Sequence, residues 1–170
     1  PTCGNYGPYV QSQRSHIYKA YVKDLLDKGL AYLCFCTHEE IDDIRKNQEI
    51  KGIRPGYYHE FAKCRHLSEA EVLKKLEQKI PFSIRYKSSG DYNKKIIVND
   101  ILKGDREFPE YDLDIVIMKS SGLPTYHFAH IIDDHLMGTT HVLRADEWFS
   151  SLPLHIALFK TMGWKPPLYG

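Results

Sequence analysis

The spacing of apolar residues changes near Phe82, and this change constrains the fold more than any other feature of the chain. Before it, apolar residues recur at helical intervals, as between residues 13 and 28, where Ile17, Tyr21 and Leu25 share one face. From Phe82 onward apolar residues alternate with polar ones, which is the pattern of a half-buried strand. The sequence therefore predicts a mixed chain in which helices give way to strands and later return.

The pattern also predicts where the individual elements lie. Helices are expected over residues 13–28, 37–50, 68–79, 125–136 and 150–162. Capping-box sequences open two of them, at Thr37 with Glu40 and at Ser68 with Glu71. Strands are expected over residues 31–36, 82–86, 95–98, 114–118 and 140–143, with 95–98 pairing with 82–86. The closing strand, helix, strand, helix order indicates a parallel α/β layer, and the middle of the chain indicates a smaller α+β insertion.

Composition is that of an ordinary globular chain of one domain, or one and a fraction. The 170 residues are 42% hydrophobic and 12% aromatic, which is enough for a core. The net charge of +1 neither requires nor excludes a nucleic-acid partner. No apolar run reaches the ~20 residues of a membrane span, and no signal-peptide pattern opens the chain. We expect a cytoplasmic protein without a membrane partner. Because Pro1 is not an initiator methionine, we expect an interior piece of a longer protein.

Four cysteines, at positions 3, 34, 36 and 64, have a spacing that suits a metal site better than a disulfide framework. On a strand, Cys34 and Cys36 would face the same side and reach one ion together. Cys64 is followed two residues later by His66. Three thiols and an imidazole form the ligand set that a tetrahedral structural zinc prefers.

The fourth ligand of such a site has alternatives. Tyr57 and Tyr58 precede Cys64, and a phenolic oxygen from either would replace the imidazole of His66. The structural alternative is that the cysteines are buried core residues, and spacing alone does not decide between a core and a metal site. A bound zinc would be structural, because four protein ligands leave no open position for water.

A second polar cluster lies in the helix predicted over residues 125–136. His130 and Asp134 are four residues apart and share a helix face, and His127 lies one turn earlier. Such a cluster is typical of a metal-dependent phosphohydrolase, of helix capping, or of a pocket for a polar substrate. We favour the substrate pocket, in which Asp133 or Asp134 would bind and fix the backbone.

Arg144 and Trp148 follow the strand predicted over residues 140–143. Proteins with a parallel α/β sheet bind ligands at the carboxyl ends of the strands. Arg144 offers a planar fork that matches a carboxylate or a phosphate, and Trp148 offers a flat face for an adenine base. The structural alternatives are an ion pair of Arg144 with Asp146 or Glu147, and core packing of Trp148.

Three segments in this part of the chain resemble, in order and spacing, the second catalytic half of bacterial-type glutamyl-tRNA synthetases. They are residues 122–130 (GLPTYHFAH), 133–138 (DDHLMG) and 142–148 (VLRADEW). Residues 7–14 (GPYVQSQR), 29–36 (GLAYLCFC) and 158–167 (LFKTMGWKPP) fit the same family. The resemblance covers essentially the whole chain, and its motifs are long and specific.

The resemblance implies an α/β fold: a Rossmann-like class I synthetase catalytic domain with an inserted α+β connective domain that grips the tRNA acceptor end. We assign residues 1–35 to the end of the first Rossmann-like half, 36–112 to the insertion, and 113–170 to the start of the second half. The implied function is that of a monomeric glutamate–tRNA ligase, which uses ATP with Mg²⁺ to activate glutamate and transfers it to the tRNA 3′ end. The implied zinc ligands in the insertion are Cys34, Cys36, Cys64 and His66.

The resemblance also gives roles to individual residues. Tyr126, His130 and Arg144 would contact glutamate, and Glu147 and Trp148 would lie beside ATP or the adenylate. The family often has Asn where this chain has His130, so the charge at that position depends on pH. The two signature sequences of the class, His-Ile-Gly-His and Lys-Met-Ser-Lys-Ser, do not occur in the chain. We therefore expect no catalytic residue in this fragment and no activity from it alone.

Three other functions stay open at this point. The chain could be a non-catalytic module that binds a tRNA acceptor stem, a tRNA-modifying synthetase paralogue, or the metal-dependent phosphohydrolase. The candidate phosphate contacts of an acceptor-stem module are Lys51, Arg54, Lys63, Arg65, Lys94 and Lys95.

Overall fold

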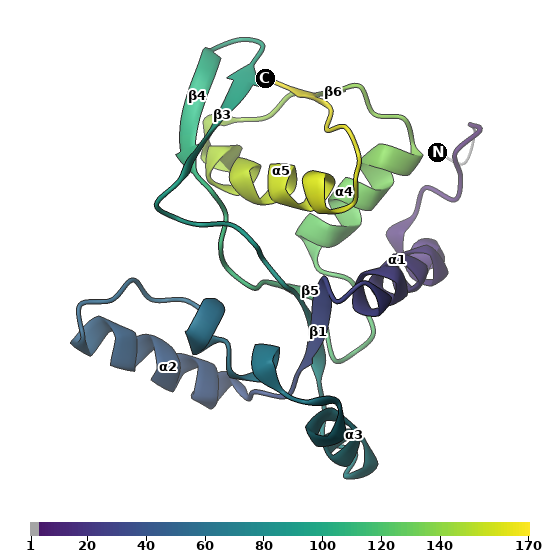
Figure 1. Cartoon of the computed structure of the whole chain (residues 1–170). Coiled ribbons are helices and arrows are strands. Elements are labelled where there is room, and N and C mark those ends of the chain that lie inside the picture. The colour runs from purple at the N-terminus through teal and green to yellow at the C-terminus, as the bar shows by residue number, and fades with distance from the viewer. Residues whose placement is uncertain (1–3) are drawn as a thin grey trace. The chain divides into compact units, whose positions relative to one another are not determined.

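The computed structural model describes residues 4–170 and divides into two compact units (Figure 1). Unit 1 contains residues 4–20, Ser89–Tyr111 and Tyr126–Gly170, and unit 2 contains Tyr21–Ser88 and Asp112–Thr125. The first three residues, which include Cys3, lie outside the described part. In the described part, no helix combines the length and the apolar character that crossing a membrane requires.

Unit 2 is built on a three-stranded antiparallel sheet with the strand order β1-β2-β5. Its elements are β1 (Ala31–Cys34), α2 (His38–Ile50), the 3-10 turns η2 (His59–Phe61) and η3 (Lys63–His66), α3 (Glu69–Glu77), β2 (Ser83–Tyr86) and β5 (Val116–Met118). Both predicted capping boxes are confirmed, since Thr37 and Ser68 accept from the third backbone N–H of α2 and α3 while Glu40 and Glu71 bind back.

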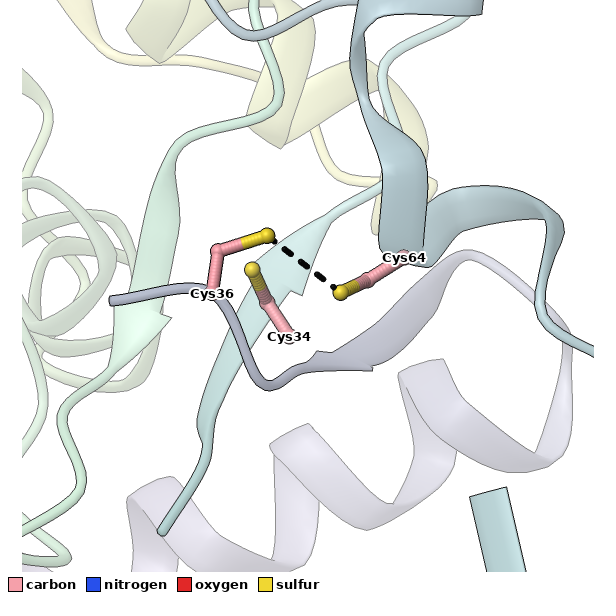
Figure 2. A group of neighbouring side chains, drawn as sticks. All are labelled: Cys34, Cys36 and Cys64. Atoms are coloured by element: carbon pink, nitrogen blue, oxygen red, sulfur yellow. Dashed lines mark hydrogen bonds between the residues drawn. The ribbon is translucent and has the colours of Figure 1, made fainter. Parts of the chain in front are cut away.

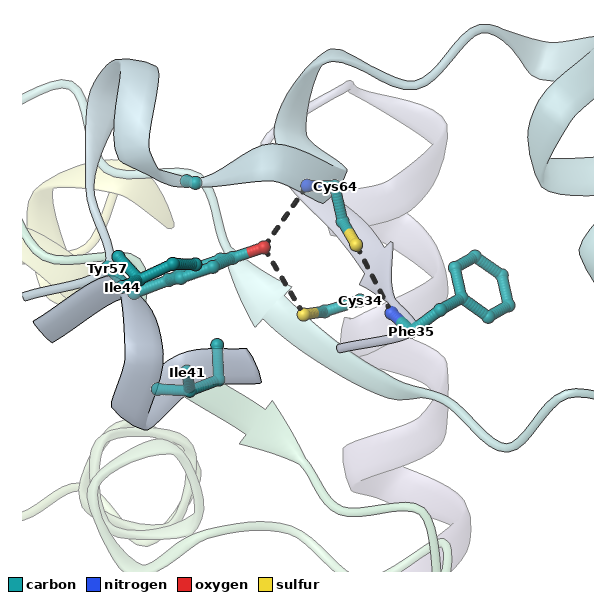
Figure 3. Close-up of a cluster of buried hydrophobic side chains, with 7 residues drawn as sticks. Cys34, Phe35, Ile41, Ile44, Tyr57 and Cys64 are labelled. Carbon is teal, nitrogen blue, oxygen red and sulfur yellow. Dashed lines mark hydrogen bonds between the residues drawn. The ribbon is translucent and has the colours of Figure 1, made fainter. Parts of the chain in front are cut away.

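A compact cluster of buried side chains forms the core of unit 2 (Figure 3). Ile41 and Ile44, three residues apart on α2, face this cluster because their spacing places them on one side of the helix. The other buried members are Cys34, Phe35, Tyr57, Ala62 and Cys64. Two cysteines and a tyrosine thus lie in an apolar environment, where unpaired polar groups are costly.

The carboxylate of Asp114, just before β5, is the buried polar centre of unit 2. Its oxygens accept two hydrogen bonds from Arg65 Nη1 at 2.8 and 3.0 Å, and one from the Tyr32 hydroxyl at 2.7 Å. The backbone N–H of Ser88 donates a further bond at 2.8 Å. Because the Asp114 side chain is fully buried, these partners replace the water that a carboxylate otherwise needs.

Unit 1 contains a four-stranded sheet with the order β4-β3-β7-β6. Its elements are η1 (Gln11–Arg14), β3 (Lys95–Asp100), β4 (Gly104–Pro109), α4 (Tyr126–Leu136), β6 (His141–Val142), η4 (Asp146–Ser151), α5 (Leu152–Thr161) and β7 (Leu168–Tyr169), and the helix α1 (Ser15–Asp27) begins here and ends in unit 2. Strand β7 pairs in parallel with both β3 and β6, while β3 and β4 form an antiparallel hairpin. The predicted parallel layer is therefore present.

The predicted pairing of residues 95–98 with 82–86 is wrong. Strand β3 pairs with β4 and β7, and β2 pairs with β1 and β5. Strands β4 and β7 were not expected, because half of the residues of β4 (GDREFP) are charged and most are exposed, and β7 has two residues. The predicted boundary of the insertion, residues 36–112, stays a prediction; the compact units place 21–35 with unit 2 and 89–111 with unit 1.

Arg14 fastens the start of the chain to α4 within unit 1. Its Nε donates to Asp133 Oδ1 at 2.7 Å, and its Nη1 donates to the Pro8 carbonyl at 2.8 Å. The Tyr18 hydroxyl donates to the other Asp133 oxygen at 2.7 Å. Burial, together with this bond to a carboxylate, raises the pKa of Tyr18 to about 12, so the phenol stays protonated.

We expect Asp114→Asn to lower the free energy of unfolding by about 3–5 kcal/mol, because it leaves the Arg65 guanidinium buried without its counter-charge. The measurement is urea denaturation of the variant and the wild-type chain.

The matched control is Asp24→Asn, which breaks an exposed i,i+4 pair with Lys28 and should cost about 0.5 kcal/mol or less. Equal losses in the two variants would contradict a special role for the buried pair.

Candidate functional site

Three cysteine thiols converge in unit 2 (Figure 2). Cys34 ends β1, Cys36 follows two residues later, and Cys64 comes from η3. Their sulfur atoms all lie within 4.8 Å of one another, and those of Cys36 and Cys64 are 3.6 Å apart. A tetrahedral zinc with Zn–S bonds of about 2.3 Å places neighbouring sulfurs about 3.8 Å apart. The three thiols therefore have the spacing that such an ion requires.

The hydroxyl of Tyr57 lies beside the thiols as a fourth candidate metal ligand (Figure 3). Its oxygen lies 3.6 Å from Cys34 Sγ and 3.4 Å from Cys36 Sγ. It also accepts the backbone N–H of Cys64 at 3.1 Å. Three sulfurs and one phenolic oxygen thus face a common point from the end of β1, the loop before η2, and η3.

His66 does not join the three thiols in this structure. Its Nε2 lies 3.2 Å from the carbonyl of His59 at an exposed position, and His66 is not among the ligand atoms that converge. Tyr58 is also engaged elsewhere, since its hydroxyl donates to the Arg54 carbonyl at 2.7 Å. Of the residues predicted as zinc ligands, the structure brings together the three cysteines and Tyr57.

The thiols share their protons unequally. Hydrogen bonds from Cys36 and then Cys64 lower the pKa of the Cys34 thiol, and the same contact with Cys34 raises the pKa of Cys36. Burial raises the pKa of Tyr57. Because zinc binds thiolates and not thiols, metal binding here would release protons and depend on pH.

Arg144, just after β6, is the principal cation of the second candidate site, in unit 1. Its Nη1 lies 3.2 Å from His155 Nδ1, and its guanidinium carbon lies 4.7 Å from the centre of the Tyr169 ring. Its Nη2 is buried and has no hydrogen-bond partner among residues 4–170. The alternative ion pair with Asp146 does not form, because Asp146 binds Lys103. Nη2 is therefore a buried donor without an aligned hydrogen bond, and the Tyr169 phenol is the polar group beside the guanidinium.

Three imidazoles gather beside Arg144: His127 and His130 from α4, and His155 from α5. His127 Nδ1 lies 2.9 Å from His155 Nε2, and the rings of His130 and His155 are 4.8 Å apart. His155 is fully buried. This burial, together with the positive charges that His130 and Arg144 would place nearby, lowers the pKa of His155 to about 2. His155 is consequently a neutral imidazole.

The two aspartates of α4 have different surroundings. Asp133 holds Arg14 and Tyr18, so it has a structural role. Asp134 Oδ2 lies 3.2 Å from His130 Nε2, yet neither atom has an aligned hydrogen-bond partner within the described residues. Burial lowers the pKa of His130 and raises the pKa of Asp134. In residues 4–170 the cysteines form the one converging ligand group, so the metal-hydrolase prediction for this helix gains no support.

Tyr126 and Trp148 form an aromatic surface next to the imidazoles. The Tyr126 ring stacks on His130 with centroids 5.6 Å apart and lies 5.5 Å from Trp148. Both are accessible, Tyr126 by 53% and Trp148 by 38%. Trp148 also lines an open pocket of about 470 Å³ with Glu147 and His127. The five predicted substrate-binding residues therefore lie in one region of unit 1.

Sequence reasoning missed His155, which connects Arg144 to His127. The available signal was a single histidine inside the apolar run LPLHIALF, residues 152–159. A polar side chain on the buried face of an otherwise apolar helix requires a partner, and here both ring nitrogens have one.

Several of the basic residues proposed as phosphate contacts already form ion pairs within the chain. Arg65 is half-buried and paired with Asp114, and Arg54 forms an ion pair with Asp112. Lys94 and Lys95 form exposed pairs with acidic neighbours. Lys51 and Lys63 line a pocket of about 210 Å³ in unit 2 that Glu60 shares. The two arginines therefore have structural roles, and the lysines are left as candidates for contact with RNA.

Residues 2–170 match the family model described as tRNA synthetases class I (E and Q), catalytic domain. Glutamate–tRNA ligases of Clostridium beijerinckii and Clostridium perfringens are each 52% identical to the chain over 166 residues, which are 98% of this chain and 30% of the relative. The ligase of Sorangium cellulosum is 48% identical over 98% of this chain and 29% of its own length. The chain thus spans about 30% of the length of these relatives.

Two solved structures of glutamate–tRNA synthetases are also similar to this chain. The crystal structure of the glutamate–tRNA synthetase of Elizabethkingia anophelis has a TM-score of 0.85 and 43% identity, over 98% of this chain and 34% of that chain. The glutamate–tRNA ligase of Elizabethkingia meningosepticum, solved in complex with its amino acid, has a TM-score of 0.85 and 41% identity, over 99% of this chain and 34% of that chain. These matches confirm the predicted resemblance and the predicted α/β, Rossmann-like fold class.

We expect the free energy of unfolding to fall by about 1.4 kcal/mol between pH 7.5 and pH 5.5 through His155 alone. The folded pKa of His155 is lowered to about 2 from 6.5, so the unfolded chain takes up a proton that the folded chain refuses. This stability is present above the unfolded pKa and is lost as the pH falls below it.

The measurement is urea denaturation across this pH range. His155→Gln should make the pH slope shallower by about one proton at its steepest, whereas His16→Gln, at an exposed position, should not change it. An unchanged slope in His155→Gln would show that His155 is not held neutral.

Proposed function

The chain belongs to the catalytic-domain family of class I tRNA synthetases for glutamate and glutamine, and on this basis we propose that it is part of a glutamate–tRNA ligase. The observation that supports this most strongly is 52% identity to glutamate–tRNA ligases over 98% of the chain. The ligase would activate glutamate with ATP and Mg²⁺ and then pass it to the 3′ end of tRNA. Its place of action would be the cytoplasm, and its state as a monomer stays a prediction.

Arg144 is the proposed binding site for a glutamate carboxylate. A guanidinium forms two parallel hydrogen bonds with a carboxylate, and here Nη2 is buried without a partner. Tyr126 and His130 would contact the same amino acid from α4. Charge-assisted bonds are strong where water is excluded, so a bond from Arg144 to the side-chain carboxylate would favour glutamate over a neutral amino acid.

Trp148 and Glu147 would receive ATP or the adenylate. An accessible indole face suits an adenine ring, and both residues line the pocket of about 470 Å³. Mg²⁺, when bound with ATP, would neutralise charge on the phosphates. Within this chain the residues bind and orient substrates. Because neither signature sequence of the class occurs, we propose that the chain alone is inactive and that tRNA is bound by the complete ligase.

The proposed zinc site consists of Cys34, Cys36 and Cys64, with Tyr57 as the fourth ligand. The S···S and S···O distances of 3.4 to 3.6 Å support this set, and His66, the ligand expected from the resemblance, lies apart from it. Zinc would be structural here and would join the end of β1 to η3.

Substitution of Arg144 tests the glutamate site. In the ligase that contains this chain, Arg144→Ala should lower kcat/KM for glutamate by about 30-fold or more, because truncation of a buried ion-pair partner costs about 2–5 kcal/mol. Glutamate-dependent ATP–pyrophosphate exchange measures this, and Lys160→Ala, at an exposed position on α5, is the matched control. Full activity of Arg144→Ala would refute the assignment.

Metal analysis of the reduced chain, purified without chelator, tests the zinc site. We expect about one zinc per chain, and we expect Tyr57→Phe to lose it at a lower chelator concentration than the wild type. His66→Ala should retain zinc like the wild type, since His66 does not face the thiols. Absence of zinc would refute the site, and the opposite ranking of the two variants would make His66 the fourth ligand.

A further inference from the structure

We infer that His155 is a positioning residue for Arg144, which it holds through a neutral hydrogen bond so that the guanidinium keeps its whole charge for the substrate. The inference rests on the proposed function, in which Arg144 binds a carboxylate of glutamate. It starts from two contacts within unit 1: Arg144 Nη1 to His155 Nδ1 at 3.2 Å, and His155 Nε2 to His127 Nδ1 at 2.9 Å.

The direction of these hydrogen bonds follows from the chemistry of the groups. A guanidinium can only donate, so Nδ1 of His155 is the acceptor and carries no proton. A neutral imidazole must then carry its proton on Nε2, which donates to His127 Nδ1. His127 in turn carries its own proton on Nε2. Arg144 thus sets the tautomers of both histidines, and the two rings fix its orientation in return.

Burial keeps this chain of contacts in place. His155 is fully buried, in the middle of α5 and between apolar neighbours. Burial lowers the pKa values of both His155 and His127, which disfavours the second proton that would reverse or break a bond. An imidazole buried at this position without partners would be costly, which makes both of its contacts part of the native state.

The neutral acceptor distinguishes Arg144 from three arginines of the chain that bind carboxylates, whereas Arg85 is, like Arg144, held by a neutral acceptor, the Asp114 carbonyl. Arg14, Arg54 and Arg65 each bind a carboxylate, of Asp133, Asp112 and Asp114. In such pairs the aspartate cancels most of the positive charge. Arg144 is oriented by a ring nitrogen with no net charge, and its Nη2, like that of Arg14, has no hydrogen-bond partner in residues 4–170. This arrangement suits an arginine whose counter-charge arrives with the ligand.

His127 extends the consequence to the pocket of about 470 Å³, which it lines together with Trp148. The tautomer set by Arg144 leaves an N–H on Nε2 of His127. His127 is therefore a hydrogen-bond donor rather than an acceptor toward whatever it meets there, which favours an anionic or carbonyl oxygen.

Kinetic comparison of three variants tests the inference in the ligase that contains this chain. His155→Leu removes the acceptor and should raise KM for glutamate by about tenfold or more, with little change in KM for ATP. His155→Asn places an acceptor near the position of Nδ1 and should restore most of that loss. His155→Asp has the same shape but adds a charge that pairs with Arg144, so it should raise KM for glutamate at least as much as His155→Leu.

A glutamate KM in His155→Asp equal to that of His155→Asn would overturn the inference, because shape alone would then explain the position. An unchanged KM in His155→Leu would do the same. If Arg144→Ala leaves the glutamate kinetics unchanged, the proposed role of Arg144 in glutamate binding fails instead, whatever the His155 variants do.

A measurement on the wild-type chain does not depend on the variants folding or on the substrate. Nitrogen-15 NMR of histidine-labelled protein at pH 7 should show His155 and His127 both protonated on Nε2 and not on Nδ1. A proton on Nδ1 of His155 would exclude the bond from Arg144 and overturn the inference.

Discussion

Asp114 organises unit 2 because each of its polar groups binds a different segment. Its carboxylate binds Arg65 and the Tyr32 hydroxyl, and its N–H donates to the Tyr57 carbonyl at 2.8 Å. Its carbonyl accepts from Arg85 at 2.7 Å, and the guanidinium of Arg85 lies 4.3 Å from the centre of the Tyr57 ring. Arg65 shares η3 with Cys64, and Tyr32 shares β1 with Cys34. The geometry of the thiol cluster therefore depends on one buried carboxylate that is not part of it.

In unit 1, two arginines have partners of different kinds. Arg14 is neutralised by Asp133 and serves to hold the chain, whereas Arg144 is surrounded by imidazoles that burial keeps uncharged. A partly buried cation that is not hydrogen-bonded to a carboxylate is less favourable for folding than a paired one, even though Asp134 interacts electrostatically with Arg144. Such strain on stability is common at binding sites, where the ligand supplies the missing charge.

The sequence predicted most of the local structure and which residues gather at the two candidate sites, whose roles stay predictions, and it failed where long-range contacts decide. Helical spacing and capping boxes located α2 and α3 because those signals lie within a few residues. The partners of β3 could not be predicted in this way. Its alternation of exposed and buried residues, with Ile97 exposed, is that of any half-buried strand and does not say which strand it pairs with. Similarly, Tyr57 and His66 are both plausible ligands by spacing, and only the fold places the phenol among the thiols. His155 was missed because a histidine within an apolar helix has no local partner.

The contact between Tyr32 and Asp114 spans 82 residues of sequence, and this separation has a consequence for synthesis. At about 5–20 residues per second, β1 leaves the ribosome about 4–16 s before the carboxylate that its tyrosine binds. In the later part of this interval, Cys34 of β1 and Cys64 of η3 are both present while Asp114 is not. The thiols are then exposed to solvent and oxidants before the fold can protect them. Early capture of a cation by the nascent thiols would shorten this vulnerable interval and bring β1 and η3 together in advance of β5.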